Sequence, residues 1–215
     1  MERMQKSRSS SVITSRKVVT NEHLNPNGTL FGGYLMCWMD EVAFMCARRF
    51  SGKPTCVTAS VDSLIFKSPL HLGEHILLSA TVCAVGLTSM QIEVLICKED
   101  PYTGSCEVAN TAYLTFVCLD AKLKPTVVPE LTLESIEDQK KNREALLRAK
   151  VRKKLHRYLE KTSNQEEDFK PTEIEDKTID NLFVDRILIK VGLNYDFLKT
   201  NKSYNRLRKA VESYI

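Results

Sequence analysis

The residue best suited to chemistry is Asp40, an acidic residue inside an otherwise apolar stretch. Between Gly33 and Phe50 the chain has neither proline nor further glycine, and apolar residues recur at helical spacing. At about 100° per residue, Asp40 falls at the edge of the apolar stripe, where we expect its carboxylate to be partly desolvated. Desolvation makes a carboxylate a stronger base, able to take a proton from water. Asp40 is therefore a candidate general base, with a structural aspartate held by the backbone or by an arginine as the alternative.

Two glycines, Gly32 and Gly33, begin the same predicted helix. The first N–H groups of a helix lack intrahelical acceptors, and together with the helix dipole they favour developing negative charge. Such a helix start can serve as an oxyanion hole, because glycine lets a substrate carbonyl approach the backbone closely. The alternative is that the two glycines only mark the end of the preceding loop. Asn27 precedes Gly28 in a turn dipeptide, and its amide is a candidate for orienting a water or a substrate oxygen.

Other common catalytic patterns are missing from the sequence. It contains no G-x-S-x-G elbow of a serine esterase, no phosphate-binding G-x-x-x-x-G-K-[ST] and no H-E-x-x-H. His71 and His75 have the spacing of a zinc pair on a helix, but Pro69 and Gly73 make a helix there unfavourable. We therefore expect neither a metal nor a bound cofactor.

The segments around the predicted helix indicate an antiparallel sheet. An edge strand is expected at residues 11–19, after which residues 21–29 form a loop rich in Asn, Pro and Gly. Four more strand-like segments follow, at residues 56–66, 75–85, 88–97 and 108–119. Short turns join the last three, so they are expected to be antiparallel neighbours. The sequence thus predicts an α+β domain in which the sheet curls around a helix that is apolar on most sides and also contacts a partner.

The domain organisation follows from composition and charge. Residues 1–10 are expected to be a flexible N-terminus and residues 11–130 the α+β domain. Residues 131–161 contain a basic amphipathic helix, since 139–161 carry 10 Lys+Arg against 2 Asp+Glu, with Leu147 and Val151 on one apolar stripe. Residues 162–215 are expected to form an acidic linker and a small helical tail.

The compartment suggested by the sequence is the cytoplasm. The chain has no apolar run long enough to span a membrane and no secretory signal. Its seven cysteines form no C-x-x-C pair and lie in apolar segments, which indicates buried, reduced thiols. The alternative is organelle targeting, because the Ser- and Arg-rich residues 1–17 are similar to a transit peptide.

The segment from Asn27 to Gly33, with Leu35-Met36 and Met39-Asp40-Glu41, resembles the signature of hotdog-fold acyl-CoA thioesterases of the bacterial and brain cytosolic acyl-CoA hydrolase type. The resemblance covers about residues 11–160 and continues through residues 57–62 and the hairpin at 86–90. It implies the hotdog fold, a long helix wrapped by a curved antiparallel sheet, here with a C-terminal helical extension. It also implies a homo-oligomer in which two domains pair edge to edge, often as three dimers in a hexamer.

The function implied by this resemblance is hydrolysis of acyl-CoA to free fatty acid and coenzyme A. The family's aspartate falls on Asp40 and its asparagine on Asn27, with the helix start at Gly32 and Gly33 polarising the thioester carbonyl. Asp40 then activates water or attacks the carbonyl directly, and the sequence does not choose between these roles. We assign the following residues to binding of coenzyme A or its pantetheine arm: Thr58, Gly86, Thr88, Ser89, Lys140, Arg143 and Arg148. Leu87 stands where the family usually has Arg or Lys, which weakens a phosphate contact in the hairpin, and a solvated basic face is the alternative for the helix.

Three other functions compete with the thioesterase hypothesis. A noncatalytic acyl-CoA or lipid-binding hotdog module would share the fold but would not need Asp40. A hotdog dehydratase needs a histidine near the helix, and His23 lacks the motif context. Nucleic-acid binding by the basic helix is disfavoured by the modest net charge of +4 and by the lack of interleaved aromatic residues.

Overall fold

The structure, a computed structural model, describes residues 3–163 and divides the chain into two compact units, Met1–Ala145 and Leu146–Ile215. The first unit contains the sheet and its helix. The boundary lies inside the last helix, and not near residue 130 as the composition suggested. The predicted tail beyond residue 163 lies outside the described residues. Within the described part, no helix is both long enough and apolar enough to cross a membrane.

The central helix, α1 (Gly32–Ser51), confirms the helix predicted from the apolar periodicity. It follows extended backbone at Phe31 and ends at Gly52, whose φ of 66° is left-handed and suits glycine. The Gly52 N–H donates to the Arg48 carbonyl at 2.9 Å. This bond satisfies one of the last carbonyl groups of the helix, which have no donor within it. One face of α1 is buried in the main core, through Leu35, Trp38, Met39, Val42, Ala43, Cys46, Ala47 and Phe50.

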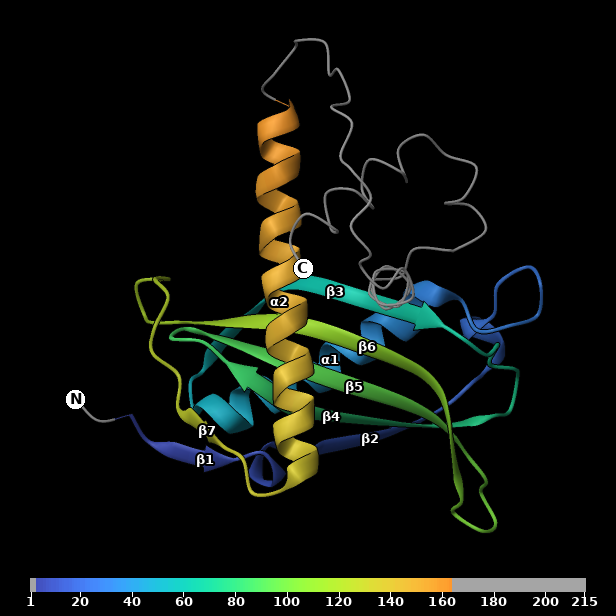
Figure 1. The fold of residues 1–215 in the computed structure, drawn as a ribbon. Helices are drawn as coiled ribbons and strands as arrows, with labels where there is room; N and C mark the ends of the chain where they lie inside the picture. The colour runs from blue at the N-terminus through green and yellow to red at the C-terminus, as the bar shows by residue number, and fades with distance from the viewer. Residues whose placement is uncertain (1–2, 164–215) are drawn as a thin grey trace, which may run out of the picture. The chain divides into compact units, whose positions relative to one another are not determined.

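A five-stranded antiparallel sheet wraps α1, as predicted (Figure 1). Its order is β2 (Ile13–Val18), β4 (His75–Val85), β5 (Ser89–Glu99), β6 (Cys106–Leu119) and β3 (Thr55–Phe66). All five strands contact α1. On β5, Met90, Ile92, Val94 and Ile96 alternate toward the core that α1 shares, as period-two strand geometry requires.

Edge strand β3 departs from regular pairing with its neighbour. Its pairing with β6 shifts between Thr58 and Ser60 and again between Val61 and Ser63. Each irregularity re-aims the side chains that follow it. Val57 and Val61 are 41% and 51% exposed, on a strand that has no neighbour on its outer side within the described residues.

The N-terminus is part of the folded domain, contrary to the flexible segment expected for residues 1–10. Strand β1 (Gln5–Ser7) pairs in parallel with β7 (Glu130–Thr132), and a 3₁₀ turn follows at Ser9–Ser11. Arg3 donates hydrogen bonds to the carbonyls of Val128 at 2.9 Å and Gly86 at 2.9 Å. Isolated three-residue strands carry little sequence signal, and this pairing joins segments more than 120 residues apart.

The outer face of the sheet carries a buried ionic cluster. Glu93 points away from the core and is 2% exposed, and Lys141 bonds to it at 2.7 Å from helix α2 (Ile136–Ser163). Tyr113 donates to the same carboxylate at 3.0 Å, and Arg8 lies 3.5 Å from it. The first turns of α2 are therefore attached by polar contacts and by buried Ala145. Leu147, from the predicted apolar stripe, is 43% exposed.

We expect Glu93→Gln to lower the free energy of unfolding by about 1–3 kcal/mol, because it leaves the largely buried Lys141 without its carboxylate, while Arg8 keeps its ion pair with Asp138 at 3.2 Å. Urea unfolding followed by circular dichroism measures this change. Glu107→Gln, at an exposed position on β6, is the matched control and should stay within about 0.5 kcal/mol of wild type. Equal stability of the two variants would contradict a stabilising role for the cluster.

Candidate active site

Asp40 lies in the third turn of α1 and faces β3. The Thr58 hydroxyl donates to Asp40 Oδ1 at 2.5 Å, so the helix and the edge strand hold the carboxylate together. The sequence predicted partial desolvation, but in the single chain Asp40 is exposed. The sheet covers the opposite side of α1, and this side carries Met36 and Met45, which are 48% and 43% exposed. The prediction was wrong for one chain because its periodicity argument did not specify what covers this side.

The start of α1 provides the free N–H groups that the glycine pair suggested. Within the described residues, the N–H groups of Gly32 and Gly33 donate to no acceptor. Aromatic rings lie directly against both glycines. A Cβ on Gly32 would be 3.3 Å from the Phe66 ring, and one on Gly33 would overlap the Phe31 ring. Glycine at these positions therefore leaves room for both rings as well as access to the backbone.

The loop before α1 is organised by Asn25, which the sequence argument did not select. Its Oδ1 accepts the Asn27 N–H at 2.9 Å, and its Nδ2 donates to the Thr29 hydroxyl at 2.9 Å. Gly28 then turns with a φ of 76°. Asn27 itself is exposed, and no contact in the described residues engages its side-chain amide. The Asn25-Pro26 dipeptide, which favours turn initiation, was the available signal.

A cavity of about 420 Å³ opens beside the start of α1. Asn25, Gly32 and Leu35 line one side, and Phe66 with buried Asn110 lines the other. Asn110 is committed to structure, since its Oδ1 accepts the Lys67 N–H at 2.7 Å. The cavity therefore lies between the side-chain amide of Asn25 and the first residues of α1. Asp40, two turns further along α1, does not line it.

The sheet register brings the predicted hairpin residues to the level of Thr58. Thr58 pairs with Phe116 on β6, and Phe116 pairs with Met90, next to Ser89. The hairpin is tightly held, because the Gly86 N–H donates to the Ser89 carbonyl at 2.8 Å. The Cys118 N–H also donates to the Thr88 carbonyl at 3.1 Å. Thr58, Gly86, Thr88 and Ser89 therefore share one end of the sheet.

The three basic residues assigned to coenzyme A fall into two groups. Lys140 and Arg143 are exposed on the first turns of α2, so both are accessible to a ligand. Lys141, between them, is engaged by Glu93. Arg148 belongs to the second compact unit.

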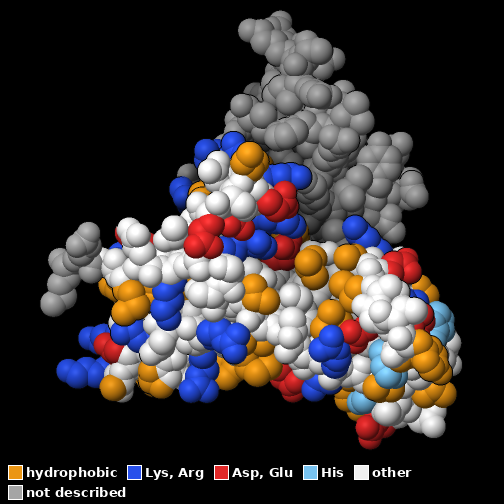
Figure 2. Space-filling model, turned by 90° about the horizontal axis from the view of Figure 1, so that it is seen from below, with side chains coloured by type: hydrophobic (Ala, Val, Ile, Leu, Met, Phe, Trp, Pro, Cys, Tyr) orange, Lys and Arg blue, Asp and Glu red, His pale blue; other side chains and the backbone are white. Residues whose placement is uncertain are grey.

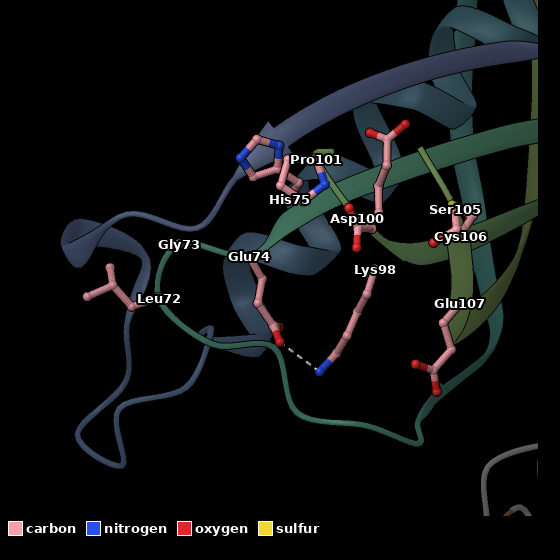
Figure 3. A pocket seen from close by; sticks show the side chains of 11 residues that line it. Leu72, Gly73, Glu74, His75, Lys98, Asp100, Pro101, Ser105, Cys106 and Glu107 are labelled. Atoms are coloured by element: carbon pink, nitrogen blue, oxygen red, sulfur yellow. Dashed lines mark hydrogen bonds and ion pairs between the residues drawn. The ribbon is translucent and has the colours of Figure 1, made fainter. Parts of the chain in front are cut away.

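A larger cavity, of about 660 Å³, lies at the other end of the sheet (Figure 3). It contains none of the predicted site residues. Its charged groups are largely paired with one another or with neighbours, as Glu74 is with Lys98 at 2.9 Å. Hydrogen bonds from Arg16 lower the pKa of Glu99. Histidine side chains gather at one side of the face shown in Figure 2, yet residues 3–163 contain no cluster of three or more side chains that could hold a metal.

Sequence comparison with known proteins identifies a family and several relatives. The model of the thioesterase superfamily matches residues 27–105. A protein of Bacillus subtilis named as an uncharacterised acyl-CoA thioester hydrolase is 37% identical over 155 residues, covering 72% of this chain and 89% of the relative. The acetyl-coenzyme A thioesterase of Rattus norvegicus is 29% identical over 140 residues, which is 65% of this chain but 25% of that longer protein.

Solved structures show the same fold. The acyl-CoA hydrolase of Staphylococcus aureus, in complex with butyryl coenzyme A and coenzyme A, superposes with a TM-score of 0.68 at 33% identity. That match covers 74% of this chain and 96% of the other. An acyl-CoA thioesterase solved as an apo hexamer gives a TM-score of 0.67 at 29% identity, over 71% and 97% of the two chains.

A curved sheet around one long helix, shared with these enzymes, defines a hotdog-fold thioesterase. Within that class, the chain belongs to the acyl-CoA thioester hydrolases, the family that its sequence resembles.

We expect Thr58→Val to reduce thioester hydrolysis by about 10- to 100-fold, because a hydrogen bond to a carboxylate contributes about 1.5–3 kcal/mol. The change keeps the side-chain shape but leaves Asp40 without its positioning donor. Steady-state kinetics on a short acyl-CoA measures the effect. Thr111→Val on β6, where the hydroxyl has no bond in the described structure, is the control. Wild-type rates for Thr58→Val would exclude this contact from the site.

Proposed function

We propose that the protein hydrolyses acyl-CoA to a carboxylic acid and coenzyme A, with Asp40 as general base or nucleophile. The observation that carries the proposal is the Asp40 carboxylate, held by Thr58 at 2.5 Å on the side of α1 that the sheet leaves open. A carboxylate in that position has one oxygen fixed and the other free to act on water or on a thioester carbon. Membership of the acyl-CoA thioester hydrolases supports the choice of substrate.

The free N–H groups at the start of α1 supply the second requirement of the reaction. A thioester carbonyl that is attacked develops negative charge on oxygen, and donors aimed at that oxygen stabilise it. Gly32 and Gly33 provide two such donors with no competing acceptor in the described chain. When the C–S bond breaks, the coenzyme A thiolate leaves and takes a proton, while the carbonyl carbon keeps the oxygen from water.

Asn25 replaces Asn27 in our proposal as the polar side chain that acts with Asp40. The Staphylococcus aureus enzyme has been solved with an asparagine, a threonine or an aspartate replaced by alanine. The asparagine and the aspartate are 15 residues apart there, as Asn25 and Asp40 are here. Asn25 also lines the cavity at the helix start, which supports a role next to the substrate.

A second copy of the chain is the partner that we propose for the open side of α1. Exposed apolar side chains occur along the open side of α1 and along edge strand β3: they include Phe31 just before α1, Tyr34 on α1, and Val61 and Phe66 on β3. Clustered exposed apolar groups favour association, and two unpaired strand edges can continue one sheet. A dimer formed this way would desolvate Asp40, and three such dimers would give a hexamer, the state of one similar thioesterase.

The remaining assignments follow from accessibility. Lys140 and Arg143 are proposed to contact the phosphates of coenzyme A, because both are exposed cations. Thr58, Thr88 and Ser89 are proposed to line the path of the pantetheine arm. The residues named require no metal or bound cofactor for this hydrolysis. We propose the cytoplasm as the compartment, a choice supported by seven cysteines that are all free.

Asp40→Asn should reduce hydrolysis by about 10²- to 10⁴-fold, because it removes the basic oxygen while keeping the volume of the side chain. Coenzyme A release from a series of short to long acyl-CoAs measures this effect and gives the chain-length preference. Sedimentation velocity shows whether the assembly is unchanged.

The control for Asp40 is Glu41→Gln, the next residue on α1, where the carboxylate is exposed and pairs with Lys17 at 3.4 Å. This variant should keep most activity. Wild-type rates for Asp40→Asn would remove Asp40 from the mechanism. If the wild type binds acyl-CoA but releases no coenzyme A, the protein is a noncatalytic binding module.

Asn25 and Asn27 provide a matched pair. Asn25→Ala should lower hydrolysis by about 10- to 100-fold, since it removes a positioned amide at the cavity. Asn27→Ala should leave the rate within about twofold, because its side chain is exposed. Steady-state kinetics of both variants with the same acyl-CoA makes the comparison. The opposite ranking would restore the original assignment to Asn27.

A further inference from the structure

Two cysteines face each other across β3 and β6, next to the end of α1. Cys56 and Cys118 are direct partners in the strand register, and their Sγ atoms are 2.9 Å apart. Both side chains are buried, at 5% and 0% exposure. The hydrolysis of a thioester as described above uses neither thiol. A pair of nucleophilic groups this close therefore calls for a separate explanation.

The backbone around this pair suits a disulfide. Directly opposed residues of antiparallel strands have Cα atoms about 4.5–5.5 Å apart, which lies within the range of about 4.4–6.8 Å found for disulfides. An S–S bond is about 2.05 Å long, so the sulfur atoms need to approach by less than about 1 Å. Small side-chain rotations can supply that movement without a change of strand register.

The surroundings of the pair favour a reactive thiolate on Cys56. The hydrogen bond shared with Cys118 lowers the pKa of the Cys56 thiol, against the opposing effect of burial. Ser51, with its hydroxyl 3.4 Å from Cys56 Sγ, and the positive charge of Arg48 act in the same direction. A thiolate with a second thiol beside it is the arrangement of a thiol that is oxidised reversibly.

We propose that Cys56 and Cys118 form an oxidation site, at which hydroperoxides convert the dithiol into a disulfide linking β3 to β6. The Cys56 thiolate attacks one peroxide oxygen and the O–O bond breaks, which gives a sulfenic acid on Cys56 and releases water from hydrogen peroxide after protonation. Cys118 Sγ then attacks Cys56 Sγ, the S–O bond breaks, and hydroxide leaves as water with the Cys118 proton. Two thiols lose two electrons, and one peroxide gains them.

This thiol pair lies next to the proposed active site. Cys56 and Thr58 are two residues apart on β3, so both point to the same side of the strand, toward α1. Ser51 contacts Cys56 and Asp40 contacts Thr58, so two successive contacts join α1 to β3. A disulfide at the first contact fixes the strand immediately before the second. The oxidation chemistry itself does not depend on the proposed hydrolysis.

The test uses the full chain carrying Cys37→Ser and Cys106→Ser, which removes the two exposed thiols. The folded protein is treated with hydrogen peroxide, quenched and analysed by intact-mass spectrometry, then by peptide mapping after differential alkylation. We expect a loss of the mass of two hydrogen atoms, a Cys56–Cys118 cross-linked peptide, and full reversal by dithiothreitol. Cys56→Ser and Cys118→Ser in the same background should each abolish the mass loss.

Two results would overturn the proposal. One is that peroxide leaves both thiols free to alkylation after unfolding. The other is that Cys56 gains oxygen atoms without cross-linking to Cys118. Both results are measured on the chain that carries only Cys37→Ser and Cys106→Ser. The test is therefore valid even if the Cys56→Ser or Cys118→Ser variant does not fold. Its mass readout involves no acyl-CoA, so it also stands if the protein proves not to be a hydrolase.

Discussion

The burial of α1 is the constraint on which the rest of the structure depends. A helix that is apolar on most sides must be covered on most sides, and each fully buried large side chain contributes about 1.5–3 kcal/mol. Five curved strands cover one part of α1, and the inward side chains of β4, β5 and β6 complete a single core with it. The side that the sheet leaves open carries Asp40 among exposed methionines. The side of α1 that the sheet leaves exposed therefore also carries the candidate catalytic residue.

The edge strand β3 connects this burial to the site. It contributes Thr58 to Asp40, Cys56 to the thiol pair and Phe66 to the cavity beside Gly32. Its irregular pairing with β6 changes which side chains face α1 along its length. A strand free on one edge can also accept a strand from a second copy. The same twelve residues thus position the carboxylate and provide the surface for assembly.

Sequence patterns predicted the main elements because those elements have strong local signals. The α1 helix has a long apolar period without breakers, and His75–Val85 matched the predicted strand at both ends. The β1–β7 pair escaped prediction because six residues in two short strands show no period.

Asp40 was identified, but its exposure was not, since burial by a partner cannot be read from one helix. The sequence pointed to Asn27 and not to Asn25 because both neighbour a turn, and the hydrogen bonds and cavity lining on which we propose Asn25 are visible only in the structure. Cys37 and Cys106 are exposed, contrary to the expectation that all seven thiols are buried, because an apolar segment at the open side of a helix or strand still faces solvent.

The attachment of the N-terminus has a consequence for how the chain reaches its final form. Gln5 pairs with Glu130, and Arg3 holds the carbonyls of Gly86 and Val128, so these contacts close a loop of more than 120 residues. Closing so long a loop lowers the conformational entropy of the chain before the new contacts can offset that loss. The β1–β7 pair can form only after β2 to β6 and the segment up to residue 130 have been synthesised. The pairing of β1 with β7 therefore forms late in folding. Any extension fused before Arg3 would begin beside the hairpin that contains Gly86.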